Sequence, residues 1–427
     1  MNSFKIWAVA RAAAAVLLGS LMAHAQGTQC STAIGRDNLV QCALRSSLAA
    51  EAQTHAVEAS RARETAVSPL LPSNPVLSAT LGRRSIPGGE RATNWYASLS
   101  QELEVAGQRG ARKRAARAEV TAQVSWLRFS QREVAVEAWA LYFEALSARE
   151  EVALTTRLSA AAQQLSNVIS AKAEQGLLPA IDADVTDALL ARALQTRFAA
   201  ERHERDAASG LASLLGGDPT VAALTVTGEL TPLDVDRLAS ETFMASNERP
   251  EVVAAEAERQ ALQLRAEAYR RSRVPNPTLS VFVEEDGFNE RVFGAGVSLP
   301  IPLPGNLGRT YRGEIAESEA LAKKVGAERE LVRRNVRLEV VSALQAYESR
   351  QREVAVLTPK KAQRAGQTLD DLRTQVEAGR LPVRDAIVAQ QSLVEFLEGE
   401  LSARLALCLA SVALARAVGF PLERQLP

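Results

Sequence analysis

The chain has 427 residues, with 50 basic and 50 acidic side chains, so its formal net charge at pH 7 is zero. This balance gives no reason to expect nucleic acid as a partner. Hydrophobic residues make up 47% of the chain and aromatic residues only 4%, and Ala, Leu, Glu, Arg, Gln and Val dominate the long stretches, as in long packed helices.

Residues 1–25 resemble a secretory signal peptide. Lys5 and Arg11 precede the apolar run AAAAVLLGSLMA, which ends at the A-x-A cleavage signature Ala23-His24-Ala25. At about a dozen residues, this run is too short to span a bilayer, and no other run approaches about 18 apolar residues. We therefore expect an exported mature chain without a membrane-crossing helix.

The cysteines agree with export. Cys30 and Cys42 lie close to the expected new N-terminus, where an oxidising compartment permits a disulfide, although two thiols remain the alternative. Lipidation of Cys30 is disfavoured because Thr28-Gln29 precedes it rather than small apolar residues. Cys408 lies in an apolar helical run, where we expect a packed core residue.

The chain repeats itself at an offset of about 200 residues. The repeated motifs, in order, are NPVLSATL and NPTLSVFV, GQRG and GNLG, GLLPAID and GRLPVRD, and LASLLGG and VALARAVGF. This predicts a first repeat over 26–215, a linker over 216–246, a second repeat over 247–420 and a C-terminal tail over 421–427.

Each repeat follows one plan. A lead-in helix, at about 38–68 and 248–273, precedes Asn-Pro and a β-hairpin, at about 75–105 and 277–304. A very long helix and a shorter helix follow. The first long run, 111–175, has no Gly or Pro, whereas Pro359 should kink or break the second.

The turns between the long and shorter helices are near copies. In both, Gly ends one helix and Pro followed by Asp starts the next. The helices also carry coiled-coil spacing, at Leu154, Leu158, Ala161, Leu165 and Val168 and again at Val394, Leu397, Leu401, Cys408 and Val412.

The strands alternate between apolar and polar residues. The apolar sets are Leu77, Ala79 and Leu81; Trp95, Ala97, Leu99, Leu103 and Val105; Leu279, Val281 and Val283; and Phe293, Ala295, Val297, Leu299, Ile301 and Leu303. This period fits a membrane β-barrel or a half-buried sheet in a soluble sandwich.

Two hairpins cannot bury such a face against helices on the order of 100 Å long. Four strands cannot close alone, since single-chain barrels start near eight. Several copies must therefore share a barrel, of about eight strands from two chains or twelve from three.

At this point the chain resembles the TolC family of outer-membrane efflux channels, the outer membrane factors. The resemblance is carried by NERPEVVAAEAERQALQLRAEAYRRSRVPNPTLSV from Asn247, by the hairpin GAGVSLPIPLPGNLGR from Gly294 and by the paired turns. The hairpin favours the heavy-metal (cobalt-zinc-cadmium) branch. The chain departs from some relatives in lacking a convincing lipobox, and its first half lacks the Arg249-Pro250-Glu251 of the second.

The resemblance implies a mainly α fold with a membrane β part. Tandem long-helix hairpins would form a periplasmic α-barrel, and four strands per chain would contribute to a twelve-stranded outer-membrane barrel in a homotrimer. The channel would dock on a periplasmic adaptor and, through it, an inner-membrane RND pump, with heavy-metal cations as cargo.

Three sites follow as hypotheses. The helix turns form the periplasmic tip and contact the adaptor; an exposed Leu there would be hard to explain otherwise. Their residues are Gly176, Leu177, Leu178, Pro179, Asp182, Gly379, Arg380, Leu381, Pro382 and Asp385. Asp370 and Asp371 would form a ring of charge at a gate, or else lie on a solvated helix face. Glu102, Glu104 and Glu284 should face the barrel interior by alternation.

Nothing in the sequence indicates an enzyme, a cofactor or a metal site. Of the histidines, His55 and His203 lie in helices among charged and polar neighbours, and no His/Cys cluster has zinc spacing. The alternatives that remain open are an outlet for type I protein secretion or drug efflux, and a periplasmic coiled-coil scaffold without a pore.

Overall fold

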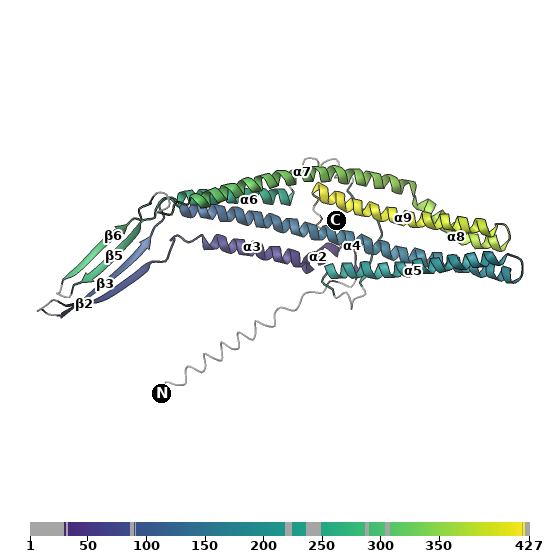
Figure 1. Ribbon diagram of the computed structural model, residues 1–427, viewed down its shortest axis with the longest axis horizontal. Helices are drawn as coiled ribbons and strands as arrows, with labels where there is room; N and C mark the ends of the chain where they lie inside the picture. The colour runs from purple at the N-terminus through teal and green to yellow at the C-terminus, as the bar shows by residue number, and fades with distance from the viewer. Residues whose placement is uncertain are drawn as a thin grey trace, which may run out of the picture. The chain divides into compact units, whose positions relative to one another are not determined.

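The computed structural model describes residues 30, 33–85, 89, 91–217, 224–235, 249–286, 290–303, 308–420 and 422. The predicted signal peptide, most of the linker and most of the C-terminal tail lie outside these residues. The described chain is mainly helical with one four-stranded sheet (Figure 1), as the sequence predicts for a single chain. It divides into two compact units, each built from three separate stretches.

The first unit comprises Ser47–Ala140, Thr231–Arg364 and Ser402–Pro427 and holds the sheet. Its helices are α3 (Leu48–Ala66), the beginning of α4 (Gln108–Glu174), α6 (Pro250–Arg271), α7 (Arg312–Val356) and the end of α9 (Val383–Val418). Figure 1 shows α6 and α7 side by side, and their residues are in contact.

The sheet has the strand order β2-β3-β5-β6, and every neighbouring pair is antiparallel. The strands are β2 (Val76–Ser85), β3 (Arg91–Glu102), β5 (Thr278–Glu285) and β6 (Arg291–Ser298). β3 and β5 come from different repeats and pair in the middle, so one sheet joins both hairpins. β3 and β6 end earlier than the sequence predicts, and the Pro-rich stretch after Ser298 is not a strand, because Pro300 and Pro302 have no N–H group for a ladder.

The second unit comprises Met1–Ser46, Leu141–Leu230 and Ala365–Leu401. It contains α2 (Leu39–Ser46), the rest of α4, α5 (Ala180–Leu214), most of α8 (Pro359–Glu377) and the first part of α9. A short parallel pair joins β1 (Ala33–Ile34) to β4 (Thr225–Val226). Beside β1, Cys30 and Cys42 form a disulfide with their Cα atoms 5.7 Å apart.

The helix boundaries follow from local chemistry. α4 runs through the predicted stretch without Gly or Pro and has 67 residues, about 100 Å of helix at 1.5 Å per residue. The second long run is interrupted where Pro359 predicts it: α7 ends at Val356 and α8 begins at Pro359. The first lead-in helix is divided at Ser47, whose side chain accepts a hydrogen bond from the Ala50 N–H.

The sequence predicts no apolar run of about 18 residues, and one helix differs from this expectation. Among the described helices, α9 alone is long and apolar enough to cross a bilayer by length and composition. Within the protein, 56% of its most apolar window is buried, and Cys408, Val412 and Leu414 are each no more than 3% exposed. Packing against neighbouring helices therefore accounts for much of its apolar character.

Candidate functional site

One face of the sheet is apolar across all four strands. The pairing places Leu77, Leu99, Val281 and Ala295 in one row and Ala79, Ala97, Val283 and Phe293 in the next. Leu77 is 75% exposed and Phe293 77% exposed, although both are large and apolar. The rows show that the two hairpins present their apolar faces on the same side, which the alternation in each strand alone does not establish.

The opposite face is mainly polar and small, with Val292 and two aromatic residues among the exceptions. Tyr96 and Phe282 lie on this face, and their rings stack with centroids 5.7 Å apart. Tyr96 pairs with Thr80 on β2, and Phe282 pairs with Gly294 on β6, so each aromatic residue has a small residue beside it. Alternation along β3 is enough to place Tyr96 on this face, whereas its contact with Phe282 depends on the pairing of β3 with β5.

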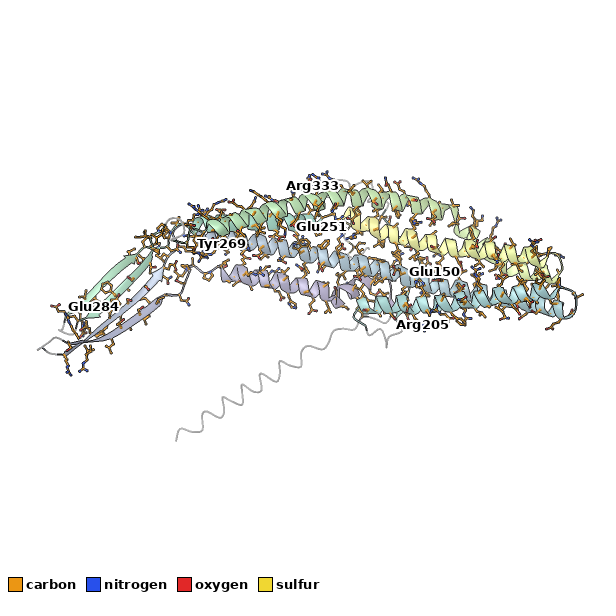
Figure 2. The ribbon with its side chains drawn as sticks, in the orientation of Figure 1. Glu150, Arg205, Glu251, Tyr269, Glu284 and Arg333 are labelled. Atoms are coloured by element: carbon orange, nitrogen blue, oxygen red, sulfur yellow. A yellow bond between two sulfur atoms is a disulfide. The ribbon has the colours of Figure 1, made fainter. Side chains whose placement is uncertain are left out.

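The three glutamates expected in the barrel interior have different surroundings. Glu284 lies on the polar face of β5, directly opposite Tyr96, and Figure 2 labels it on the sheet. Glu102, the last residue of β3, accepts a hydrogen bond of 2.7 Å from Asn276 Nδ2. Glu104 lies beyond the end of β3, so alternation does not place it on either face. Its side chain is 8% exposed and is bound to Arg112 at 2.6 Å.

Glu102 and Glu104 border a cavity of about 550 Å³ where the strands join the helices. Arg112, Asn276 and Tyr311 also line it. Gln108 donates hydrogen bonds to Asn276 Oδ1 at 2.9 Å and to the Val274 carbonyl at 3.3 Å. This network fixes the exit of β3 and the entry to β5, which gives Glu102 and Glu104 a structural role at the foot of the sheet.

The paired helix turns are the same in backbone detail. Gly176 has φ +73° and Gly379 has φ +66°, the left-handed region in which glycine is favoured. In the first turn Gly176 N–H bonds to Ala173 O and Leu177 N–H bonds to Lys172 O. In the second, Gly379 and Arg380 make the equivalent bonds to Val376 and Gln375. Both are Schellman caps, so the repeat holds at this level.

The two turns pack against each other within their unit. Leu165, Ile169, Val376, Val383 and Ala386 form a buried cluster, and Leu178 and Leu381 pack against it. In addition, Lys172 Nζ donates to the carbonyl oxygens of Val376 and Glu377, each at 2.9 Å, at the C-terminal end of α8.

The packing changes the interpretation of the turn leucines. Leu178 and Leu381 are partly buried, so the internal core explains them, and the expectation of exposed leucines fails for these two. Leu177 is 67% exposed and is the leucine of the turns that packing does not explain. Pro179, Arg380, Pro382 and Asp385 are exposed, and Asp182 is half-buried.

The two aspartates before the second turn differ in their contacts. Asp370 Oδ2 lies 3.4 Å from Arg157 Nη2 on α4, and both side chains are more than half exposed. Asp371 is exposed and has no ion-pair partner among the described residues. Asp370 is thus part of a link between α4 and α8, and only Asp371 presents an uncompensated charge.

The described residues contain no group of three or more His, Cys, Asp or Glu side chains placed to hold a metal ion. His55 contacts Glu58 at 3.0 Å and His203 contacts Glu151 at 2.8 Å, each on a helix surface. The carboxylate of Glu58 raises the pKa of His55 by hydrogen bonding and charge.

Among the comparisons with known proteins, the solved structures agree on the fold. No protein-family model matches the chain. Protein CyaE of Bordetella pertussis is 27% identical over 250 residues, which cover 56% of this chain and 53% of CyaE, so the match spans about half the length of that relative. A membrane protein from Pseudomonas aeruginosa matches with a TM-score of 0.74 and 22% identity over 90% of each chain.

The outer-membrane channel OprN matches with a TM-score of 0.71 and 17% identity over 91% of each chain. The chain shares its fold with these structures. At such identities the likeness establishes architecture, and assignment to the heavy-metal branch stays a prediction from the hairpin sequence.

Proposed function

We propose that this protein is the outer-membrane channel subunit of a tripartite export system. Three chains would pool their sheets into one twelve-stranded barrel and their helices into a periplasmic tunnel. The duct would be passive and would connect the periplasm to the exterior, with export powered by an RND pump in the inner membrane.

The observation that carries this proposal is the exposed apolar face of a sheet whose two edge strands are unpaired within the described chain. β2 and β6 are the edges of the described sheet, and a lipid environment tolerates no unpaired edge. A wall of four strands also falls short of the roughly eight that a closed barrel needs. Closure by neighbouring copies satisfies the edge strands and places the apolar face against lipid. The sequence resemblance to the outer membrane factors implies three copies rather than two.

The proposal predicts opposite effects for neighbouring residues on β2. Leu77→Arg places a charge on the apolar face and, near the middle of a bilayer, costs about 2–4 kcal/mol, so insertion into the outer membrane should fall sharply. Ser78→Arg, on the polar face, should insert normally. Membrane fractionation and heat-modifiability on gels measure both. Equal behaviour of the two variants would contradict the lipid-facing assignment.

Fractionation also separates the proposed channel from the other class of function. The unmodified chain should appear in the outer membrane as a heat-modifiable trimer that gives stepwise conductance in planar bilayers. A periplasmic coiled-coil scaffold would instead be released with the soluble periplasm and give no conductance.

The turn surface is proposed to contact the adaptor, with Leu177 as its apolar centre. The flanking Asp182, Arg380 and Asp385 supply a polar rim, the arrangement of protein interfaces in general. Gly176, Gly379, Pro179 and Pro382 shape the turns, while Leu178 and Leu381 hold them together from inside.

A gate is proposed at Asp371, one copy from each chain forming a ring that favours cations. Asp371→Ala should lower the cation selectivity of single channels, whereas Asp385→Ala, in the turn, should leave it unchanged. Selectivity that is unaltered by Asp371→Ala would place this carboxylate on a solvated outer face.

Cationic cargo fits the acidic residues proposed for the duct, and heavy-metal ions are the class that the hairpin resemblance favours. Deleting the gene should then sensitise cells to Co²⁺, Zn²⁺ or Cd²⁺. Unchanged metal tolerance together with loss of a secreted protein would favour a type I secretion outlet.

A further inference from the structure

The polar face of the sheet brings together three side chains with a shared chemistry. Tyr96 on β3 lies directly opposite Glu284 on β5, and Phe282 lies two residues before Glu284 on the same face. The Tyr96 and Phe282 rings are nearly parallel, at 28°, and stack across the β3–β5 pair. The result is a two-ring aromatic surface with a carboxylate at its side.

Gly294 leaves space for the Phe282 ring of this surface. Phe282 lies over Gly294 on β6, and a Cβ added to that glycine would lie 2.6 Å from Phe282 Cε1. This is too close for an unshifted ring, so any larger residue at 294 would displace Phe282 from the sheet. The glycine therefore leaves the space over β6 that the Phe282 ring occupies.

The carboxylate of Glu284 has no ion-pair or hydrogen-bond partner among the described residues. Its neighbour Glu285, on the opposite face, accepts a hydrogen bond from Trp95 Nε1 and is bound to Arg291, both at 3.1 Å. These two neighbouring glutamates thus differ in their charge partners. The charge of Glu285 is neutralised within the chain, and the charge of Glu284 is available to a ligand.

We propose that Tyr96, Phe282 and Glu284 form a binding patch for planar organic cations. The faces of aromatic rings attract cations through the ring quadrupole, flat rings stack on flat ligands, and the free carboxylate supplies the opposite charge. A bare metal ion would find one carboxylate where such ions take several oxygen, nitrogen or sulfur ligands. This inference rests on the proposed function only in that the patch would line the duct; there it would retain planar organic cations, a class of cargo other than the metal ions that the hairpin resemblance favours.

The first test measures binding without requiring a pore. Ethidium, a planar aromatic cation, is titrated into the purified full-length protein in detergent and followed by its fluorescence. Phe282→Leu and Tyr96→Leu should each weaken binding by about fivefold, the order expected for a solvent-exposed cation–aromatic contact, and Glu284→Gln should weaken it by a similar factor. Gly294→Ala should weaken it as well, because it moves the Phe282 ring.

Matched controls lie on the opposite face. Phe293→Leu removes a ring of the same size, and Glu285→Gln removes the carboxylate next to Glu284 in the sequence. Both variants should leave the affinity for ethidium within about twofold of the unmodified protein. Pyrenesulfonate, a planar anion, should bind more weakly than ethidium and should lose no affinity in Glu284→Gln, and the binding of Co²⁺ should not depend on Phe282. The proposed patch would be contradicted if the two sets of variants lost ethidium affinity equally, or if that affinity did not change in Phe282→Leu and Glu284→Gln.

The second test separates this inference from the proposed function. In planar bilayers, ethidium should cause brief blockades that shorten in Phe282→Leu and Glu284→Gln, while conductance without ethidium remains. Conductance with blockades that these variants do not change would overturn the patch and leave the channel standing. Binding that depends on the patch, with no conductance at all, would overturn the channel and the role of the patch in passage.

Discussion

At the scale of single residues, the Arg-Pro-Glu motif that the first repeat lacks has a structural explanation. Arg249 is 4% exposed and lies just before α6. Its guanidinium is bound to Glu251 at 2.5 Å and Glu339 at 2.8 Å, and donates to the Ala417 carbonyl at 3.2 Å. Arg416 extends the network by binding the same Glu339 at 3.0 Å. One buried arginine therefore ties together α6, α7 and the end of α9.

Removing this arginine should be costly. Arg249→Met leaves Glu251, itself 8% exposed, without its partner, and breaking a buried pair costs about 3–5 kcal/mol. Thermal unfolding in detergent should show a large loss of stability. Arg352→Met, whose pair with Glu348 is exposed on one helix, should change stability by less than about 0.5 kcal/mol. Similar effects of the two variants would contradict the role given to the buried network.

A surface pair predicts a pH dependence of known sign. Hydrogen bonding by Arg271 lowers the pKa of Glu267, with a smaller contribution from the charge of Arg114. A carboxyl group with a lowered folded-state pKa stabilises the fold above its unfolded pKa, and this stability is lost as the pH falls through the folded value. Glu267→Gln should therefore lower stability at pH 7 by less than about 1 kcal/mol.

The same substitution should have no effect at a pH below the folded-state pKa, where Glu267 is protonated in both states. Unfolding midpoints measured from neutral to strongly acidic pH would show the two curves converging. A constant gap across this range would mean that Glu267 acts through packing and not through charge.

At the scale of elements, the two Schellman turns make a sharp stability prediction. Gly176 has open space around a hypothetical Cβ, so Gly176→Ala tests the positive φ alone and should destabilise by about 1 kcal/mol. Gly399 also has open space but lies inside α9, where alanine is favoured, so Gly399→Ala should stabilise by up to about 1 kcal/mol. Effects of equal sign would mean that backbone conformation does not govern these positions.

The same turn should discriminate between surface and core leucines. Leu177→Asp should abolish cross-linking to the adaptor while trimers remain intact, because this side chain is exposed. Leu381→Asp should instead reduce trimer yield, because it places a charge against the cluster around Val376 and Val383. Leu48→Asp, another exposed leucine, is the control for cross-linking. Cross-linking that survives Leu177→Asp would remove the turn from the adaptor interface.

Much of the element pattern could be predicted because it is local. Gly and Pro in GLLPAID and GRLPVRD stop and restart helices wherever they occur, and alternation fixes the face of a residue inside a strand. The rest depended on partners distant in the sequence. Leu178 is partly buried because α8 and α9 cover it, and the stacking of Tyr96 on Phe282 requires β3 to pair with β5. Alternation does not apply to Glu104, because its strand ends two residues before it.

At the scale of the whole molecule, the number of chains in the channel decides whether the barrel closes. Co-expression of tagged and untagged chains should give the series of mixed species expected for a trimer, one more than a dimer allows, in native mass spectrometry. A series that ends at the dimer would imply an eight-stranded barrel, since each chain has a four-stranded sheet, and would contradict the twelve-stranded proposal.

The pairing of large with small residues in the two hairpins has a consequence for the symmetry of such a pore. On the polar face, the first hairpin carries its aromatic residue on its second strand, as Tyr96 beside Thr80, and the second carries it on its first strand, as Phe282 beside Gly294. The two rings therefore meet inside each chain, and the small residues are left for the boundary between chains. Duplication gave the wall near-equivalent halves, and this exchange breaks their equivalence, so aromatic sectors and small-residue sectors would alternate around the circumference of the bore.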